Sequence, residues 1–110
     1  MKQIVVDQLR PGDRDRIEEL LTRRFGESPL PGIYWVPLPE DALSPVQEEH
    51  PDCAPFVIAL EVSETALSCE LLVRSRQRMR CSCVAYATEG QVLYLLRLLD
   101  GLLGELGIAV

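Results

Sequence analysis

Three runs of strand length, residues 56–62, 67–74 and 79–86, follow one another along the second half of the chain. Apolar residues recur at every second position in each run, a period that predicts strands with one buried face. The predicted buried face consists of Phe56, Ile58, Leu60, Val62, Leu67, Cys69, Leu71, Val73, Met79, Cys81, Cys83 and Ala85. Because short polar segments join the runs, we expect them to pair as an antiparallel β-meander.

A leucine-rich helix is expected to cover this meander. Thr88 and Gln91 stand at the spacing of a capping box, in which each side chain accepts a hydrogen bond from the other residue's backbone N–H. Apolar residues then recur at helical spacing on one broad stripe: Val92, Leu95, Leu96, Leu99, Leu102, Leu103 and Leu106. The stripe predicts a helix that ends near Leu106 and packs on the buried face of the sheet.

The first half of the chain predicts a second long helix and two further strands. Residues 13–25 carry an apolar stripe, with acidic residues in the first turn and arginines in the last, which suits the helix dipole. Residues 4–6 and 33–36 are typical of short strands. The latter is expected at a sheet edge, because Pro37 cannot donate a ladder hydrogen bond. Residues 41–49 predict a short helix that the following proline ends.

We therefore predict one α+β domain that spans residues 1–110. Its two layers are an antiparallel β-meander and the two long helices. The meander supplies three strong strands, and the whole sheet has four to five. A chain of 110 residues is close to the usual size of one domain, so a second core is not expected.

Charge and cysteine content narrow the choice of partners and compartment. A net charge of −6 would repel a phosphate backbone, so nucleic acid is not expected as a partner. No apolar run approaches the ~18 residues of a membrane span, so no membrane contact is expected either. The first residues lack the pattern of a secretory signal. Four cysteines without an export signal suggest a reducing compartment, and we expect the cytoplasm.

The spacing of histidine and cysteine suggests a metal site. His50 and Cys53 form an H-x-x-C pair, and Cys81 and Cys83 form a C-x-C pair. One imidazole and three thiols are a ligand set that Zn²⁺ binds tetrahedrally. The competing interpretation places the cysteines, with Cys69, in the core as small apolar residues. It is favoured by the predicted strand, in which a C-x-C sends both thiols to one face, too far apart for a relaxed disulfide. On this interpretation no cofactor is expected, and zinc is the alternative.

Four arginines, Arg74, Arg76, Arg78 and Arg80, alternate along the last predicted turn of the meander. On a hairpin their side chains would converge at one tip, where like charges repel. Guanidinium groups suit phosphate and carboxylate, so a bound anion or an acidic partner would offset the repulsion. In the alternative interpretation the tip is simply solvated, with Arg74 and Arg80 paired to Glu70 and Glu61.

Apolar residues also remain on surfaces that the two helices do not cover. They are Val57, Leu72, Val84 and Tyr86 on the outer sheet face, and Leu93, Tyr94 and Leu98 on the flank of the last helix. Exposed apolar patches often mark contacts with partners. We therefore predict a non-enzymatic interaction or regulatory module that acts as a homodimer or binds another protein. The alternative is a metal- or thiol-dependent binding protein built on His50, Cys53, Cys81 and Cys83. No catalytic residue is assigned, because no nucleophile signature accompanies His50 and Cys53.

The opening strand and helix, residues 4–25 with the intervening segment Leu9-Arg10-Pro11-Gly12-Asp13, resemble the start of the GNAT family of N-acetyltransferases. Three antiparallel strands followed by a helix are also similar to the middle of that family. The resemblance implies an acetyl-CoA site in a glycine-rich loop before the later helix, which corresponds to residues 87–90. That loop has a single glycine and the carboxylate of Glu89, which would repel phosphate. A degenerate N-acetyltransferase-like domain is therefore a second alternative.

Overall fold

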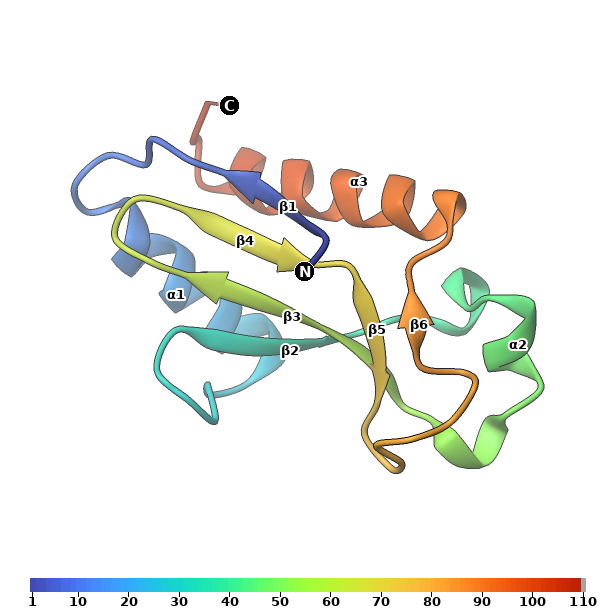
Figure 1. Cartoon of the computed structure of the whole chain (residues 1–110). Helices are drawn as coiled ribbons and strands as arrows, with labels where there is room; N and C mark the ends of the chain where they lie inside the picture. The colour runs from blue at the N-terminus through green and yellow to red at the C-terminus, as the bar shows by residue number, and fades with distance from the viewer. Residues whose placement is uncertain (110) are drawn as a thin grey trace.

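The computed structural model describes residues 1–109 and has two layers, a sheet and the long helices that pack on one of its faces (Figure 1). The strands are β1 (Gln3–Val6), β2 (Ile33–Pro37), β3 (Phe56–Val62), β4 (Leu67–Glu70), β5 (Leu72–Ser75) and β6 (Ala85–Tyr86). The helices are α1 (Asp13–Phe25), α2 (Pro45–Glu48) and α3 (Glu89–Glu105), with the 3₁₀ turns η1 (Glu40–Ala42) and η2 (Pro51–Cys53). The predicted α+β class with an antiparallel sheet and two long helices is confirmed.

Strand β3 lies at the centre of the sheet. It pairs with β2 along one edge, and along the other with β4 near its C-terminal end and β5 near its N-terminal end. Strand β1 extends the sheet beyond β4, and β6 extends it beyond β5. All these pairings are antiparallel. Within residues 1–109 the one partner of β2 is β3, which confirms the predicted edge position of this strand.

The second predicted strand is split into β4 and β5 by a bulge. Leu60 pairs with Cys69 and Val57 with Arg74, so β3 advances three residues (57 to 60) while its partner advances five (69 to 74). The two extra residues bend the sheet at this point. Because two residues make one full side-chain period, Cys69 and Val73 still point to the same inner face, and neither has any exposed surface.

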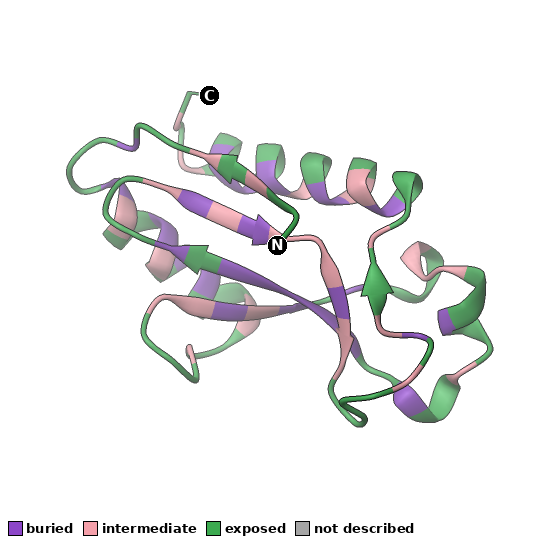
Figure 2. Cartoon of the chain, in the orientation of Figure 1, coloured by how far each residue is buried: buried purple, intermediate pink, exposed green. Residues whose placement is uncertain are grey.

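Both long helices pack on the inner face of the sheet and form one core with it. Figure 2 shows buried residues along the sides of α1 and α3 that face the strands. The predicted capping box of α3 is confirmed, since Gln91 N–H donates to Thr88 Oγ1 at 3.2 Å and Thr88 N–H donates to Gln91 Oε1 at 3.0 Å. Among the described residues, no helix combines the length and apolar character needed to cross a membrane.

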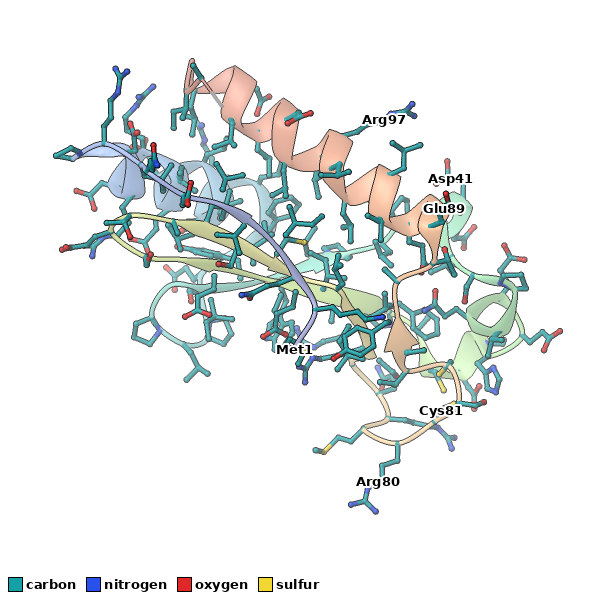
Figure 3. The ribbon with its side chains drawn as sticks, turned by 45° about the horizontal axis from the view of Figure 1, so that its top comes forward. Met1, Asp41, Arg80, Cys81, Glu89 and Arg97 are labelled. Carbon is teal, nitrogen blue, oxygen red and sulfur yellow. The ribbon has the colours of Figure 1, made fainter. Side chains whose placement is uncertain are left out.

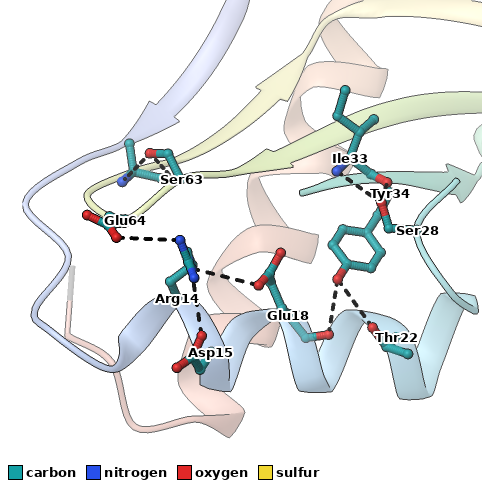
Figure 4. Close-up of polar contacts among 10 residues, drawn as sticks. Arg14, Asp15, Glu18, Thr22, Ser28, Ile33, Tyr34, Ser63 and Glu64 are labelled. Atoms are coloured by element: carbon teal, nitrogen blue, oxygen red, sulfur yellow. Dashed lines mark hydrogen bonds and ion pairs between the residues drawn. The ribbon is translucent and has the colours of Figure 1, made fainter. Parts of the chain in front are cut away.

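Polar contacts attach α1 to the strands beside it (Figure 4). The hydroxyl of Tyr34 on β2 lies 3.2 Å from Thr22 Oγ1 and donates to the Glu18 carbonyl at 3.5 Å. Arg14 reaches the β3–β4 turn, where its guanidinium lies 3.6 Å from the Glu64 carboxylate. These contacts fix the helix along the edge of the sheet that β2 occupies.

The predicted helix of residues 41–49 is instead two short turns, η1 and α2. Pro45 begins α2, a position at which a missing N–H costs nothing. Ser44 caps the helix, because Gln47 N–H donates to Ser44 Oγ at 3.3 Å and Ser44 N–H donates to Gln47 Oε1 at 3.0 Å. The chain therefore contains a second capping box that the sequence reasoning missed.

The third predicted strand is wrong over most of its length, because only β6 forms at its end. Residues 76–84 instead make an irregular segment, which we call the arginine loop. The Ser75 hydroxyl oxygen accepts hydrogen bonds from the backbone N–H groups of Gln77 and Arg78 at 3.1 and 3.0 Å, and this local turn diverts the chain from the strand direction. Met79, predicted to be buried, is 94% exposed.

Candidate metal centre

Three thiols from two separate segments converge beside the arginine loop. Cys53 ends the 3₁₀ turn η2, and Cys81 and Cys83 belong to the loop. Their Sγ atoms all lie within 4.8 Å of one another. The Cys53 thiol donates to Cys81 Sγ over 3.7 Å. Figure 3 shows Cys81 at this end of the molecule, with Arg80 projecting away from it. The structure therefore brings together the three cysteines of the suggested ligand set.

The three thiols converge because the third predicted strand does not form around Cys81 and Cys83. Val84 N–H donates to the Cys81 carbonyl at 3.0 Å and closes a turn around the C-x-C segment. In this turn the thiols of Cys81 and Cys83 can approach each other, whereas alternate residues of an extended strand are held farther apart. Cys53 and Cys83 are each 1% exposed and Cys81 is partly exposed. Cys53, Cys69 and Cys83 all belong to the hydrophobic core and Cys81 packs against it, but Cys69 is not one of the three clustered thiols.

His50 lies at the start of η2, one turn before Cys53. The N–H of Cys53 donates to the His50 carbonyl at 3.0 Å. On the imidazole, Nδ1 lies 2.6 Å from the Val46 carbonyl oxygen, and this hydrogen bond is the main reason that the pKa of His50 is raised. When Nδ1 carries the proton, Nε2 keeps its lone pair for a ligand. The sequence-predicted fourth ligand is thus half-buried with its ring held by the backbone, but it is not among the ligand atoms that lie within 4.8 Å of one another.

The three thiols differ in their readiness to ionise. Hydrogen bonds from the side chain and backbone of Cys83 lower the pKa of Cys81 to about 7, and the nearby His50 charge acts in the same direction. Burial raises the pKa of Cys83 to about 12 and also raises that of Cys53. The cluster without a metal therefore holds one readily formed thiolate beside two thiols.

The sulfur separations suit a tetrahedral metal better than a disulfide. Two thiolates bound to one tetrahedral Zn²⁺ at about 2.3 Å must lie about 3.8 Å apart. Cys53 and Cys81 are separated by 3.7 Å. A disulfide would require these two atoms to approach to about 2.05 Å. The pair is therefore already at the spacing of two zinc ligands.

The four arginines of the predicted anion contact take different partners. Arg74 pairs with Glu70 and Arg78 with Asp52, each at 3.1 Å. The guanidinium of Arg76 lies over the Trp35 ring, 6.0 Å from its centroid. Arg80 makes no ion pair within residues 1–109, so the pair with Glu61 is not formed. The expected convergence at one hairpin tip is replaced by dispersal along the bent chain.

The predicted dimer residues differ in their exposure to solvent. Tyr86 and Leu93 are 42% and 48% exposed. Val57 is 3% exposed, and Leu72, which pairs with Tyr86 between β5 and β6, is partly buried. The remaining three, Val84, Tyr94 and Leu98, are partly buried against the main core. Antiparallel partners share a face, so Trp35 and Ala59 join Val57 on the outer sheet face, and Trp35 was missed.

Two buried glutamines next to the thiols were also missed. Gln47 Nε2 donates to the Cys83 carbonyl at 3.3 Å, and Gln91 Nε2 donates to Gln47 Oε1 at 2.8 Å. The sequence signal was present in part, because S-x-x-Q and T-x-x-Q both match capping boxes. Nothing in the sequence indicated that the two boxes would meet.

Comparisons of the chain with protein-family models, with curated proteins and with solved structures give no match.

Proposed function

We propose that the protein binds Zn²⁺ through Cys53, Cys81 and Cys83, with His50 as the fourth ligand. The observation that carries the proposal is the approach of three Sγ atoms to within 4.8 Å of one another. They come from segments that the sheet strands β3 to β5 separate along the chain. Four protein ligands leave no open coordination position, which is typical of a structural zinc site.

The ion would act as a clamp on an otherwise weakly held segment. The arginine loop lies outside the regular strands, and its central residues are exposed. A metal bound by two loop cysteines and by η2 would tie this loop to the body of the domain. Metal binding of this kind contributes directly to folding free energy, because the unfolded chain offers no preformed site. We thus propose a binding module that the metal ion stabilises, and we assign no catalysed reaction to it.

The orientation of His50 supports its inclusion as a ligand. Histidines that bind metals usually donate the second ring N–H to a backbone carbonyl or carboxylate, which fixes the ring. The contact of Nδ1 with the Val46 carbonyl provides this arrangement and leaves Nε2 as the ligand atom. The imidazole lies outside the group of three Sγ atoms, so metal binding would have to bring Nε2 toward them.

The metal proposal is tested by titrating zinc-free protein with Co²⁺, whose visible bands report tetrahedral coordination and thiolate ligands. We expect one equivalent to bind and Zn²⁺ to displace it. The Cys53→Ala variant should lose the thiolate-rich spectrum. Cys69→Ala is the matched control and should keep it, because Cys69 is as buried as Cys53 but is not one of the three clustered thiols. Binding of less than about a tenth of an equivalent, or equal loss in both variants, would remove the proposal.

A second candidate function, homodimerisation through the outer sheet face, has its own supporting observations. Both long helices pack on the inner face, so Trp35 and Leu72 remain partly exposed on the other side. This face carries Arg76 beside Trp35 at one end and Glu61 opposite Ile33 at the other. Neither charge forms an ion pair within residues 1–109. A two-fold axis between two copies, perpendicular to β3, would bring each Arg76 against the Glu61 of the other copy.

The dimer proposal is tested by charge exchange with light scattering as the measurement. We expect Arg76→Glu and Glu61→Arg each to weaken association, because each places like charges opposite each other. The double variant restores opposite charges and should dimerise again. A wild-type chain that stays monomeric at concentrations of tens of micromolar would refute the dimer, and so would single variants that associate as the wild type does.

A further inference from the structure

The capping boxes of two helices meet in the interior, close to the cysteine cluster. The box of α2 uses Gln47 and that of α3 uses Gln91, each at the third position of its helix. Gln47 is 2% exposed and Gln91 is 4% exposed. Buried amides need partners for both the oxygen and the nitrogen, because an unsatisfied buried polar group costs about 1–3 kcal/mol. Here one hydrogen bond joins the two side chains, and backbone groups supply the remaining partners.

The hydrogen bonds form a chain that ends at the C-x-C turn. Gln91 Oε1 accepts from Thr88 N–H, while its Nε2 donates to Gln47 Oε1 at 2.8 Å and to the Ala42 carbonyl at 2.9 Å. Gln47 Oε1 also accepts from Ser44 N–H. Its Nε2 donates to the Cys83 carbonyl at 3.3 Å. The direction of donation is therefore fixed along the whole chain, from Gln91 to Gln47 to the backbone of Cys83.

Capping alone does not explain why both residues are glutamine. The third position of a capping box accepts glutamate or glutamine, since only an acceptor oxygen is needed. A carboxylate at either position could not donate onward, and a buried charge would carry a large desolvation cost. The requirement for glutamine therefore comes from the donor side of each amide. For Gln47 that donor serves the Cys83 carbonyl.

We propose that Gln47 is a positioning residue for the metal site, and that Gln91 holds the Gln47 amide in the orientation that this role requires. This inference rests on the proposed metal function. By holding the Cys83 carbonyl, Gln47 fixes the C-x-C turn with its sulfur atoms toward Cys53. A turn that is already ordered loses less conformational freedom when the metal binds. Substitution of groups that orient metal ligands typically weakens affinity by about 10–100-fold.

The inference is tested by comparing Gln47→Met with Ser44→Ala in Co²⁺ titrations. Each variant loses one of the two hydrogen bonds of the α2 capping box, but only the first also loses the acceptor for Gln91 and the donor to the Cys83 carbonyl. We expect Q47M to bind Co²⁺ about tenfold or more weakly than the wild type, with thiolate bands broadened or shifted. S44A should bind within about twofold of the wild type, because the Gln47 amide still reaches Cys83 in that variant.

The outcomes separate the inference from the function on which it rests. If the wild type binds no Co²⁺, the metal site itself fails. If the wild type binds it and Q47M binds as tightly as S44A, the metal site stands and the positioning role is overturned. Should Q47M fail to fold, Gln91→Met provides the second test, because it keeps Gln47 but frees its amide. A several-fold loss of Co²⁺ affinity in Q91M would support the role, and wild-type affinity would overturn it.

Discussion

Replacement of Cys83 by alanine should raise the pKa of Cys81 in the metal-free protein. The side chain of Cys83 donates the hydrogen bond that contributes most to lowering this pKa from 9.0 to about 7. At pH 7 a thiol with a pKa of about 7 is about half ionised, whereas one with a pKa of 9 is only about 1% ionised. The backbone N–H of Cys83 and the His50 charge remain in the variant, so we expect the pKa to move part of the way toward 9.

The pH at which alkylation of Cys81 reaches half its maximal rate is a better measure of the Cys81 pKa than the rate at one pH. A lower pKa increases the thiolate fraction but also makes each thiolate less nucleophilic, with a Brønsted coefficient of about 0.4–0.5. Across two pKa units this second effect offsets about eightfold of the gain. The midpoint of the pH profile depends on ionisation alone, and it should shift upward in Cys83→Ala.

Short pulses of iodoacetamide across the range from about pH 5 to about pH 10, followed by peptide mass spectrometry, would give this midpoint for each cysteine. Cys83→Ser is the matched control, because its hydroxyl can still donate to Cys81, and its midpoint should stay near that of the wild type. Cys69 is an internal control. Burial raises its pKa to about 12, so it should remain unmodified in the folded protein. A wild-type midpoint near 9, or the same midpoint in Cys83→Ala and wild type, would refute the reasoning.

Four further substitutions bear on stability, each measured as the free energy of unfolding in urea. Gly32→Ala should destabilise by about 1 kcal/mol or more, because φ is +77° and a Cβ would lie 2.8 Å from the Val62 carbonyl. Gly101→Ala, on the open side of α3, should stabilise by up to about 1 kcal/mol; equal effects would contradict the geometry. Leu95→Ala should cost about 2–5 kcal/mol, since Leu95 has no exposed surface. Met79→Ser should change stability by less than about 0.5 kcal/mol; a loss of 2 kcal/mol would show that Met79 is buried after all.

The predictions that the structure confirms depend on interactions between residues that are close in the sequence. The Thr88 and Gln91 box is a contact between residues three apart, so the sequence contains all of it. The alternation in β3 reports burial of the inner face, and Phe56, Ile58 and Leu60 are indeed buried. The edge position of β2 followed from Pro37, whose missing N–H is also a local property. These elements were predictable because each depends on a period or on a cap.

The arginine loop shows where periodicity misleads. Met79, Cys81, Cys83 and Ala85 alternate like the inner face of a strand, but only Cys83 is buried in the core, with Cys81 packed against it, while Met79 and Ala85 are exposed. A strand also needs a partner edge, but β5 and β6 pair only at residues 72–73 with 85–86. The Ser75 hydroxyl and the Cys81–Val84 turn take up backbone hydrogen bonds that a ladder would have used. The alternation of apolar residues does not show whether a local turn or a strand that is distant in sequence will take up the backbone hydrogen bonds of a segment.

The set of candidate ligands was determined by the sequence, because only His50 and the cysteines offer nitrogen and sulfur in chelating pairs. The structure decided that three of these thiols share one place, since η2 and the arginine loop are brought together by the pairing of β3 with β5. It also decided that Gln47 meets Gln91, a contact between residues 44 apart. The β-meander and the leucine-rich helix follow from short periods along the chain. The convergence of the three thiols depends on long-range pairing, which periods and caps do not encode.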